Sequence, residues 1–303
     1  MKIIPKDIED ILGFKINSEL KNQIEKFDFS YEILSNEERD NYFVNVLSTL
    51  FNDIIHSGEH RIDDWENGWN DNLEKFKMYR SIEYLIPKYH GKYNLVRWKG
   101  DIIKPTIDNF DYKIHICFVD AILQHYIDDC NHVFEFGCGP AYHLLRLNKF
   151  NDKLKLYGLD WTESSQQIIK EININFNLNL SSYKFDFFNP DYNIDIPKNS
   201  LFYTVAALEQ VGENFGPFID FILNKKPKIC IHLEPIDELL NENKLIDKLS
   251  ILYFRKRKYL NGFLPYLIKL QEENKIEIIK QQRIFSGSYF IEGHSLIVWK
   301  PKN

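Results

Sequence analysis

The sequence of 303 residues has few cysteines, no excess of positive charge and no long apolar run. The four cysteines include no CxxC pair, and the sequence has no cluster of histidines at metal-ligand spacing. We therefore expect free, buried thiols and no metal site. The first residues also lack the long apolar segment of a secretion signal, so a cytoplasmic protein is expected. The cysteines are Cys117, Cys130, Cys138 and Cys230.

Other absences exclude further classes of protein. The net charge of -6 disfavours a general binder of nucleic acid, which would normally be basic. No segment approaches 18 uninterrupted apolar residues, so we expect no membrane span. What is present is a hydrophobic content of 44% and an aromatic content of 15%, enough for a large core. The length fits one large domain, or a core with an extension.

Residues 1–114 differ in pattern from the rest of the chain. Apolar residues recur there at helical spacing, which predicts a helical extension. Residues 63–98 of this extension are rich in aromatic side chains. These rings either pack on the core or form the wall of a ligand pocket, and both interpretations stay open. They include Trp65, Trp69, Tyr79, Tyr84, Tyr89, Tyr93 and Trp98.

From residue 115 onward, predicted strands alternate with predicted helices. This alternation is typical of an α/β fold whose sheet is mostly parallel and has helices on both faces. One long helix is expected from about 247 to 273. The last two strands, within 275–285 and 294–302, lie too close in sequence for a crossover, so they should be antiparallel. The other strands are expected within 132–137, 153–160, 181–188, 199–208 and 227–236.

A glycine turn follows the first of these strands, in the segment "HVFEFGCGPAYHLLRL". Glycines at the carboxyl end of a buried strand let the backbone turn tightly and approach a ligand, because they have no Cβ. Dinucleotide sites use GxGxxG, with the pyrophosphate on the helix N-terminus. Here Gly137 and Gly139 fit that pattern, but Tyr142 occupies the third glycine position. An NAD-type oxidoreductase is therefore disfavoured, although it remains an alternative.

Acidic residues stand at the ends of three successive predicted strands. Glu135 precedes the turn and could face a cationic amino-acid group. Asp160 could accept hydrogen bonds from a ribose diol. Asp186, beside Phe185 and Phe187, could accept one from an adenine amine. Such a set suits S-adenosylmethionine, a cationic ligand with no phosphate.

The segments around these residues also resemble those of a known protein family. The segments "VFEFGCGPAYHL", "LYGLDWTESS", "FDFF" and "LFYTVAALEQVG" resemble the successive motifs of class I S-adenosylmethionine-dependent methyltransferases, over roughly 115–300. The resemblance implies a doubly wound, mostly parallel seven-stranded sheet with one antiparallel strand. The proline and alanine after the second glycine depart from the many members that have glycine nearby. The cofactor-binding residues it implies are Glu135, Gly137, Gly139, Asp160, Asp186 and Phe187, and we add Trp161, which follows Asp160.

Residues after the fourth and fifth strands of this family face the transferred methyl group and its acceptor. Glu209, His232 and Glu234 are therefore the candidate catalytic residues, with a histidine well suited to a general base. His232 could equally be a core residue, and Glu234 a solvated loop acid. The candidate substrate-binding residues are Gln210, Arg255, Tyr259, Tyr289 and His294, and the extension offers Tyr89, His90 and Arg97.

The sequence thus predicts a methyltransferase that uses S-adenosylmethionine and acts on a small or medium polar acceptor, preferably at a hydroxyl. A sugar or polysaccharide precursor is one candidate, because the whole chain resembles methyltransferases associated with surface-polysaccharide genes. Residues 1–114 would act as a lid or acceptor wall on a 115–303 methyltransferase domain, and a homo-oligomer is one expectation. The rival class, besides an oxidoreductase, is a non-catalytic scaffold subunit that binds S-adenosylmethionine.

Overall fold

The computed structural model describes residues 1–302 and contains a seven-stranded sheet in the order β6-β5-β4-β7-β8-β11-β9. The neighbouring pairs among β6, β5, β4, β7 and β8 are parallel, whereas β11 is antiparallel to both β8 and β9. The expected fold class, with its single antiparallel strand, is therefore confirmed. The strands are β4 (His132–Phe136), β5 (Lys155–Asp160), β6 (Ser181–Lys184), β7 (Ser200–Val205), β8 (Ile229–Glu234), β9 (Ile276–Gln282) and β11 (Ser295–Pro301).

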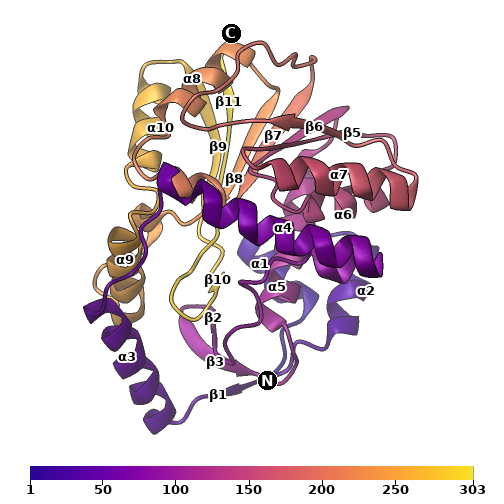
Figure 1. Cartoon of the computed structure of the whole chain (residues 1–303). Coiled ribbons are helices and arrows are strands. Elements are labelled where there is room, and N and C mark those ends of the chain that lie inside the picture. Colours follow the sequence, from indigo (N-terminus) through magenta and orange to yellow (C-terminus); the bar gives the residue numbers. More distant parts are fainter. Residues whose placement is uncertain (303) are drawn as a thin grey trace.

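Helices cover both faces of this sheet (Figure 1). Successive residues of β4 belong to different hydrophobic clusters, Val133 to one face and Phe134 to the other, because side chains alternate along a strand. Burial on both faces explains why these strands are almost continuously apolar. On one face lie α5 (Phe110–Tyr126), α6 (Tyr142–Phe150) and α7 (Glu163–Phe176), and on the other α8 (Gly216–Lys225) and α10 (Phe263–Glu272).

The predicted single helix over 247–273 is wrong, because the chain forms two helices there. α9 (Leu245–Arg257) ends at Lys258, and α10 begins after Gly262. Both flanking residues have positive φ, 53° and 77°, which a continuing right-handed helix cannot contain.

The extension contains a small antiparallel sheet as well as the expected helices. Its strand order is β1-β3-β2-β10, and β10 comes from the C-terminal part of the chain. The short hairpin between β2 and β3 turns at Lys99 and Gly100, both with positive φ. Strands this short give a weak signal in sequence. The elements are α1 (Pro5–Leu12), α2 (Ser18–Phe27), β1 (Tyr31–Ile33), α3 (Asn36–Phe51), α4 (Ile62–Tyr79), β2 (Val96–Trp98), β3 (Asp101–Pro105) and β10 (Ser286–Gly287).

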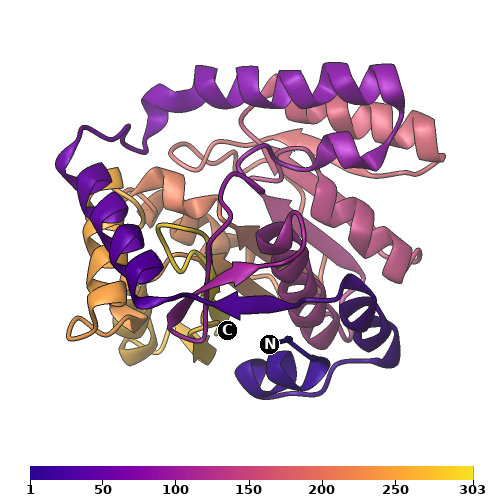
Figure 2. The same cartoon turned by 90° about the horizontal axis from the view of Figure 1, so that it is seen from below.

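Helix α4 of the extension crosses the large domain and lies alongside α7 (Figures 1 and 2). The Glu66 carboxylate accepts hydrogen bonds from the backbone N–H groups of Glu163 (2.7 Å) and Ser164 (2.9 Å), at the start of α7. A carboxylate stabilises that helix end because four N–H groups there lack helical partners. Next to the end of α4, Arg80 forms an ion pair of 2.5 Å with Glu171. These contacts hold α4 over the carboxyl ends of the strands.

No helix among residues 1–302 is long and apolar enough to cross a membrane. The four cysteines are all buried and unpaired, as expected.

Candidate functional site

The turn after β4 needs glycine for two separate reasons. Gly137 and Gly139 both have positive φ, 72° and 49°, a conformation that side chains disfavour. Space is also lacking, since a Cβ on Gly137 would lie 2.3 Å from the Cβ of Ala207, and one on Gly139 would lie 2.8 Å from the Trp69 ring. The backbone of the turn is thus packed between the loop after β7 and helix α4, and it borders two pockets.

The first pocket, which we name the glycine-turn pocket, has a volume of about 520 Å³ and lies between the turn and the extension. Glu135 lines it and is 2% exposed. Its Oε1 is 2.9 Å from Nδ1 of His143, while its Oε2 has no hydrogen-bond partner among residues 1–302. A buried carboxylate oxygen without a partner is costly, so this atom is suited to receive a ligand's N–H group.

The second pocket, the aromatic pocket, has a volume of about 490 Å³ and lies on the other side of Gly137. Asp160, at the end of β5, lines it together with Trp161 and Phe187. The Asp160 carboxylate accepts hydrogen bonds from the N–H of Gly139 (2.8 Å) and from the N–H (3.0 Å) and hydroxyl (2.7 Å) of Thr162. A carboxylate has about four acceptor positions, so capacity for one more donor remains. Burial raises the Asp160 pKa.

Asp186 is placed differently from the other two acids. Its carboxylate accepts hydrogen bonds from the backbone N–H of Phe188 (2.8 Å) and the side-chain amide of Asn189 (3.3 Å). It therefore stabilises its own turn and does not line the aromatic pocket, which Phe187 does. The predicted contact between Asp186 and an adenine amine would need this carboxylate to turn.

Both pockets share wall residues with a much larger cleft of about 1640 Å³ between the extension and the large domain. Trp65, Trp69 and Ala206 line all three spaces, so they mark the junction. The two tryptophan rings are stacked 5.5 Å apart. Both interpretations of the aromatic extension hold for these two residues, which pack on the hydrophobic core and also line the pockets. The aromatic residues that line the cleft are Trp65, Trp69, Tyr89, Tyr93, Tyr253, Tyr259, Tyr289 and Phe290.

Glu209 lies in the cleft wall, on the short 3-10 helix η3 (Leu208–Val211) that follows β7. It is 8% exposed, and burial together with the nearby Glu234 raises its pKa to about 8. The side-chain amide of Gln210 donates a hydrogen bond of 2.9 Å to its Oε1. Gln210 lines both the aromatic pocket and the cleft. These two predicted residues therefore lie side by side, Glu209 in the cleft wall and Gln210 between the cleft and the aromatic pocket.

Glu234 holds the backbone of the segment that contains Glu209. It is fully buried and lines none of the three spaces. Its carboxylate accepts hydrogen bonds from three consecutive backbone N–H groups, those of Ala207 (3.1 Å), Leu208 (3.0 Å) and Glu209 (3.1 Å). Burial raises its pKa to about 7. The geometry favours a positioning residue over the catalytic role predicted for it.

His232 is a core residue, and the structure does not support its prediction as a general base. It is 1% exposed, and its ring lies 5.1 Å from the ring of Phe263 and 6.2 Å from that of Trp299. Its Nδ1 is 3.0 Å from the Thr204 hydroxyl. Burial lowers the His232 pKa to about 3. The buried alternative considered from the sequence is the correct one.

The basic run at the end of α9 places one arginine at the cleft, and it is not the predicted Arg255. Arg255 is largely exposed, lies near Asp237 (3.8 Å) and Glu242 (3.4 Å), and does not line the cleft. Arg257 lines it instead, with Tyr253 and Tyr259. Residues two apart on a helix point in nearly opposite directions, whereas Tyr253 and Arg257, four apart, share a face. That spacing groups Arg257 with Tyr253, but it does not say which face of α9 meets the cleft.

Tyr289 and His294 both line the cleft, where the sequence prediction placed them. Tyr289 is stacked 4.8 Å from Tyr93 of the extension. His294 lies 4.3 Å from the His115 ring, and burial, with His90 and His143 nearby, lowers its pKa to about 3. Despite these histidines, no cluster with metal-binding geometry is found within residues 1–302.

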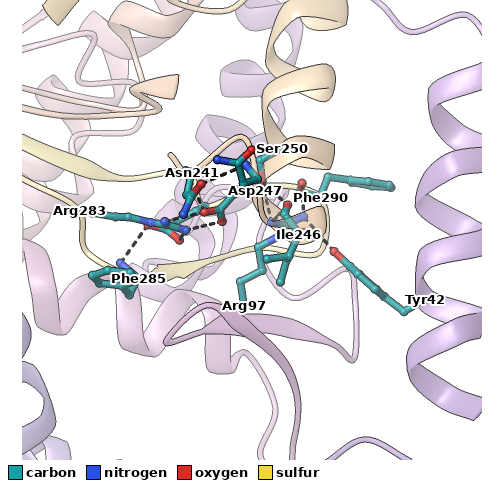
Figure 3. Close-up of polar contacts among 11 residues, drawn as sticks. Tyr42, Arg97, Asn241, Ile246, Asp247, Ser250, Arg283, Phe285 and Phe290 are labelled. Carbon is teal, nitrogen blue, oxygen red and sulfur yellow. Dashed lines mark hydrogen bonds and ion pairs between the residues drawn. The ribbon is translucent and has the colours of Figure 1, made fainter. Parts of the chain in front are cut away.

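A buried polar network fixes the outer wall of the cleft (Figure 3). Arg97 of β2 donates hydrogen bonds to the hydroxyls of Tyr42 (2.9 Å) and Ser250 (2.6 Å) and to the backbone carbonyl of Phe290 (2.8 Å). Arg97 thus connects the extension, α9 and the 288–294 loop rather than facing a ligand. Arg283 forms ion pairs with Asp247 and Glu292, both 2.5 Å.

No protein-family model matches the chain. No curated protein matches it either. Among solved structures, the small RNA methyltransferase HEN1 has a TM-score of 0.46 at 15% identity, over 63% of this chain and 25% of that one. NcsB1, an O-methyltransferase from neocarzinostatin biosynthesis, has a TM-score of 0.44 at 12% identity, over 88% and 70%. A SAM-dependent methyltransferase from Aquifex aeolicus has 0.41 at 15%, over 60% and 88%. These are similarities of fold, and it is the strand order of the large sheet that establishes the fold class.

Proposed function

We propose that this protein transfers a methyl group from S-adenosylmethionine to a small acceptor bound in the cleft. One observation carries the proposal. Gly137 lines two pockets, Glu135 lines one of them and Asp160 the other, and both share Trp65, Trp69 and Ala206 with a third and larger space.

The charge of the two pockets supports a cationic cofactor. Neither is lined by Lys or Arg, whereas each is lined by a buried carboxylate. A dinucleotide would bring a pyrophosphate into this setting with no cation beside it, which disfavours the oxidoreductase alternative. The Trp65 and Trp69 rings at the junction suit a positively charged sulfur, because cations are attracted to indole faces.

Each part of the cofactor has its own candidate binding residues. Glu135 would accept hydrogen bonds from the amino group, Asp160 from the ribose, and Trp161 and Phe187 would enclose the adenine. When bound, S-adenosylmethionine supplies an activated methyl group with a good leaving group. The protein's part is to align the acceptor and to exclude water, and α4 with its two tryptophans covers the junction where this matters.

Glu209 is the group best placed to receive a proton from an acceptor hydroxyl. It is the carboxyl that lines the cleft next to the junction, and a pKa of about 8 is close to that of an efficient base at neutral pH. Gln210 fixes its orientation. A sugar or polysaccharide precursor is a candidate acceptor, because flat aromatic walls stack well against ring faces.

Calorimetric titration with S-adenosylmethionine, S-adenosylhomocysteine and NAD tests the proposal. We expect micromolar binding of the first two, weak or no binding of NAD, and a loss of affinity of tenfold or more in Asp160→Ala. The surface variant Asp191→Ala serves as the control and should bind like the wild type. Tight NAD binding would favour the oxidoreductase. Binding of S-adenosylmethionine without methyl transfer to any of a broad panel of hydroxylated acceptors would favour the scaffold subunit.

A further inference from the structure

The cations that line the cleft differ in whether a carboxylate compensates their charge. Arg61 forms an ion pair with Asp64 (3.1 Å), and Lys88 forms one with Asp71 (2.5 Å). Arg257 and Lys92 line the same cleft, and neither forms an ion pair with any of residues 1–302, but Lys92 is exposed to solvent whereas the Nε of Arg257 is buried. An unpaired guanidinium at the wall of a large cleft is a ready anion site.

The hydrogen bonds of Arg257 are also incomplete. Its guanidinium donates one hydrogen bond, to the backbone carbonyl of Ile55, and its Nε–H is buried without a partner among the described residues. Its Cζ lies 5.1 Å from the centroid of the Tyr259 ring, within the range of a cation–π interaction. The carboxyl that interacts with it is Glu209, and with a pKa of about 8 this group is mostly neutral at pH 7. The positive charge of Arg257 therefore remains uncompensated at neutral pH.

Two other arginines of this region lie in a buried network (Figure 3). Arg283 forms ion pairs with Asp247 and Glu292, whereas Arg97 forms no ion pair among residues 1–302 and instead donates four hydrogen bonds to neutral hydroxyl and carbonyl oxygens. Neither arginine lines the cleft. The contacts of Arg97 with Ile246 and Ser250, and of Arg283 with Asp247, tie α9 to the rest of the chain, and Arg257 lies at the end of this helix.

Flat aromatic surfaces stand beside Arg257. Tyr253, one helical turn earlier, is stacked on Phe290 with ring centroids 5.0 Å apart and an angle of 8°. Both rings line the cleft. A ring-shaped ligand can stack on such a surface while a charged substituent reaches the guanidinium.

From this arrangement we propose that Arg257 binds an anionic group, a carboxylate or a phosphate, on a ring-shaped acceptor whose hydroxyl faces Glu209. The inference rests on the proposed function, because it names the class of acceptor: a hydroxylated ring that carries an acid group. In this proposal, Arg257 makes the protein bind acidic acceptors more tightly than their neutral analogues.

Three ring probes of similar size test the anion subsite: benzoate, phenyl phosphate and the neutral benzamide. Their affinities are measured by NMR titration at pH 7, with and without saturating S-adenosylhomocysteine. We expect at least one anionic probe to bind tenfold more tightly than benzamide, and the better of the two identifies carboxylate or phosphate as the natural group. In Arg257→Gln this preference should fall below threefold.

Arg255→Gln is the matched control, because it removes the same charge two residues away on the exposed side of α9. It should keep the wild-type preference, and Arg257→Lys, which keeps a cation, should keep part of it. Equal binding of anionic and neutral probes by the wild type, or an unchanged preference in Arg257→Gln, would overturn the subsite. Failure of S-adenosylhomocysteine to bind would instead overturn the proposed function, since the probe preference is also measured without it.

Discussion

The pair of pockets around Gly137 and the cleft beside them are built in different ways. The aromatic pocket takes most of its walls from the ends of neighbouring parallel strands, the glycine-turn pocket combines such strand ends with residues of the extension, and both border the backbone positions Gly137 and Ala206. The cleft takes its walls from α4, the 88–96 segment, α9 and the 288–294 loop, and it is lined by side chains far apart in sequence. The comparison teaches that the cofactor would be recognised by the fold itself and the acceptor by additions to the fold.

The largest effect should come from adding one methyl group to the glycine turn that borders both pockets. In Gly137→Ala the new Cβ would lie 2.3 Å from the Cβ of Ala207, in a residue whose φ is positive. We expect the affinity for S-adenosylhomocysteine to fall by roughly a hundredfold or more, because the turn must move. Calorimetry measures it. The control is Gly216→Ala, where an added Cβ meets no atom within 4 Å and which should change affinity less than twofold.

A second substitution sharpens this test. The double variant Gly137→Ala with Ala207→Gly removes the atom with which the new Cβ collides. It should recover part of the lost affinity, leaving the cost of an alanine at positive φ, about 1–2 kcal/mol. No recovery at all would show that the loss has another origin than this contact.

A substitution in the cleft should lower the turnover rate rather than the affinity for the cofactor. Glu209→Gln keeps the size of the side chain but cannot accept a proton. Once an acceptor is identified, we expect kcat to fall about a hundredfold or more, with the affinity for S-adenosylhomocysteine changed less than threefold. The wild-type kcat should rise with pH and level off above about 8, because the base must be ionised. A profile that is flat from pH 6 to 9 would contradict this role.

The residues of the two pockets and those of the cleft also differ in how well the sequence predicts them. Glu135, Gly137, Gly139 and Asp160 lie within single strand–turn–helix units, so local pattern is enough to place them. Asp186 also follows a strand, yet local pattern could not tell that its carboxylate would bond its own turn.

The residues of the cleft depend on facts that local sequence does not contain. Whether Arg255 or Arg257 faces the cleft is decided by where α9 packs. His232 lies in the core because Phe263 and Trp299, distant in sequence, close over it. The four-stranded sheet of the extension escaped prediction because β10 reaches it from the other end of the chain.

The smallest expected effect is on thermal stability, and it distinguishes Glu209 from Glu234. Burial raises the Glu209 pKa from 4.5 to about 8, so the folded state keeps its proton while the unfolded state loses it. Stability is therefore lost as pH rises from 4.5 to 8, and Glu209→Gln removes this penalty of a few kcal/mol. Its Tm should match the wild type near pH 4.5 and exceed it by several degrees at pH 8.

Glu234→Gln provides the contrast, because a single amide oxygen cannot satisfy three backbone N–H groups. It should lower the Tm at neutral pH, although the pKa of Glu234 is also raised, to about 7. Thermal denaturation followed by circular dichroism measures both variants. A rise in Tm for Glu234→Gln equal to that for Glu209→Gln would contradict the positioning role.

A crystal structure with S-adenosylhomocysteine bound tests the central claim, that the two pockets and the cleft form one site, most directly. The account predicts the adenine in the aromatic pocket, the ribose at Asp160, the amino group at Glu135, and the sulfur at the junction of Trp65, Trp69 and Ala206, facing the cleft. A ligand bound elsewhere, or one whose sulfur faces away from the cleft, would contradict it.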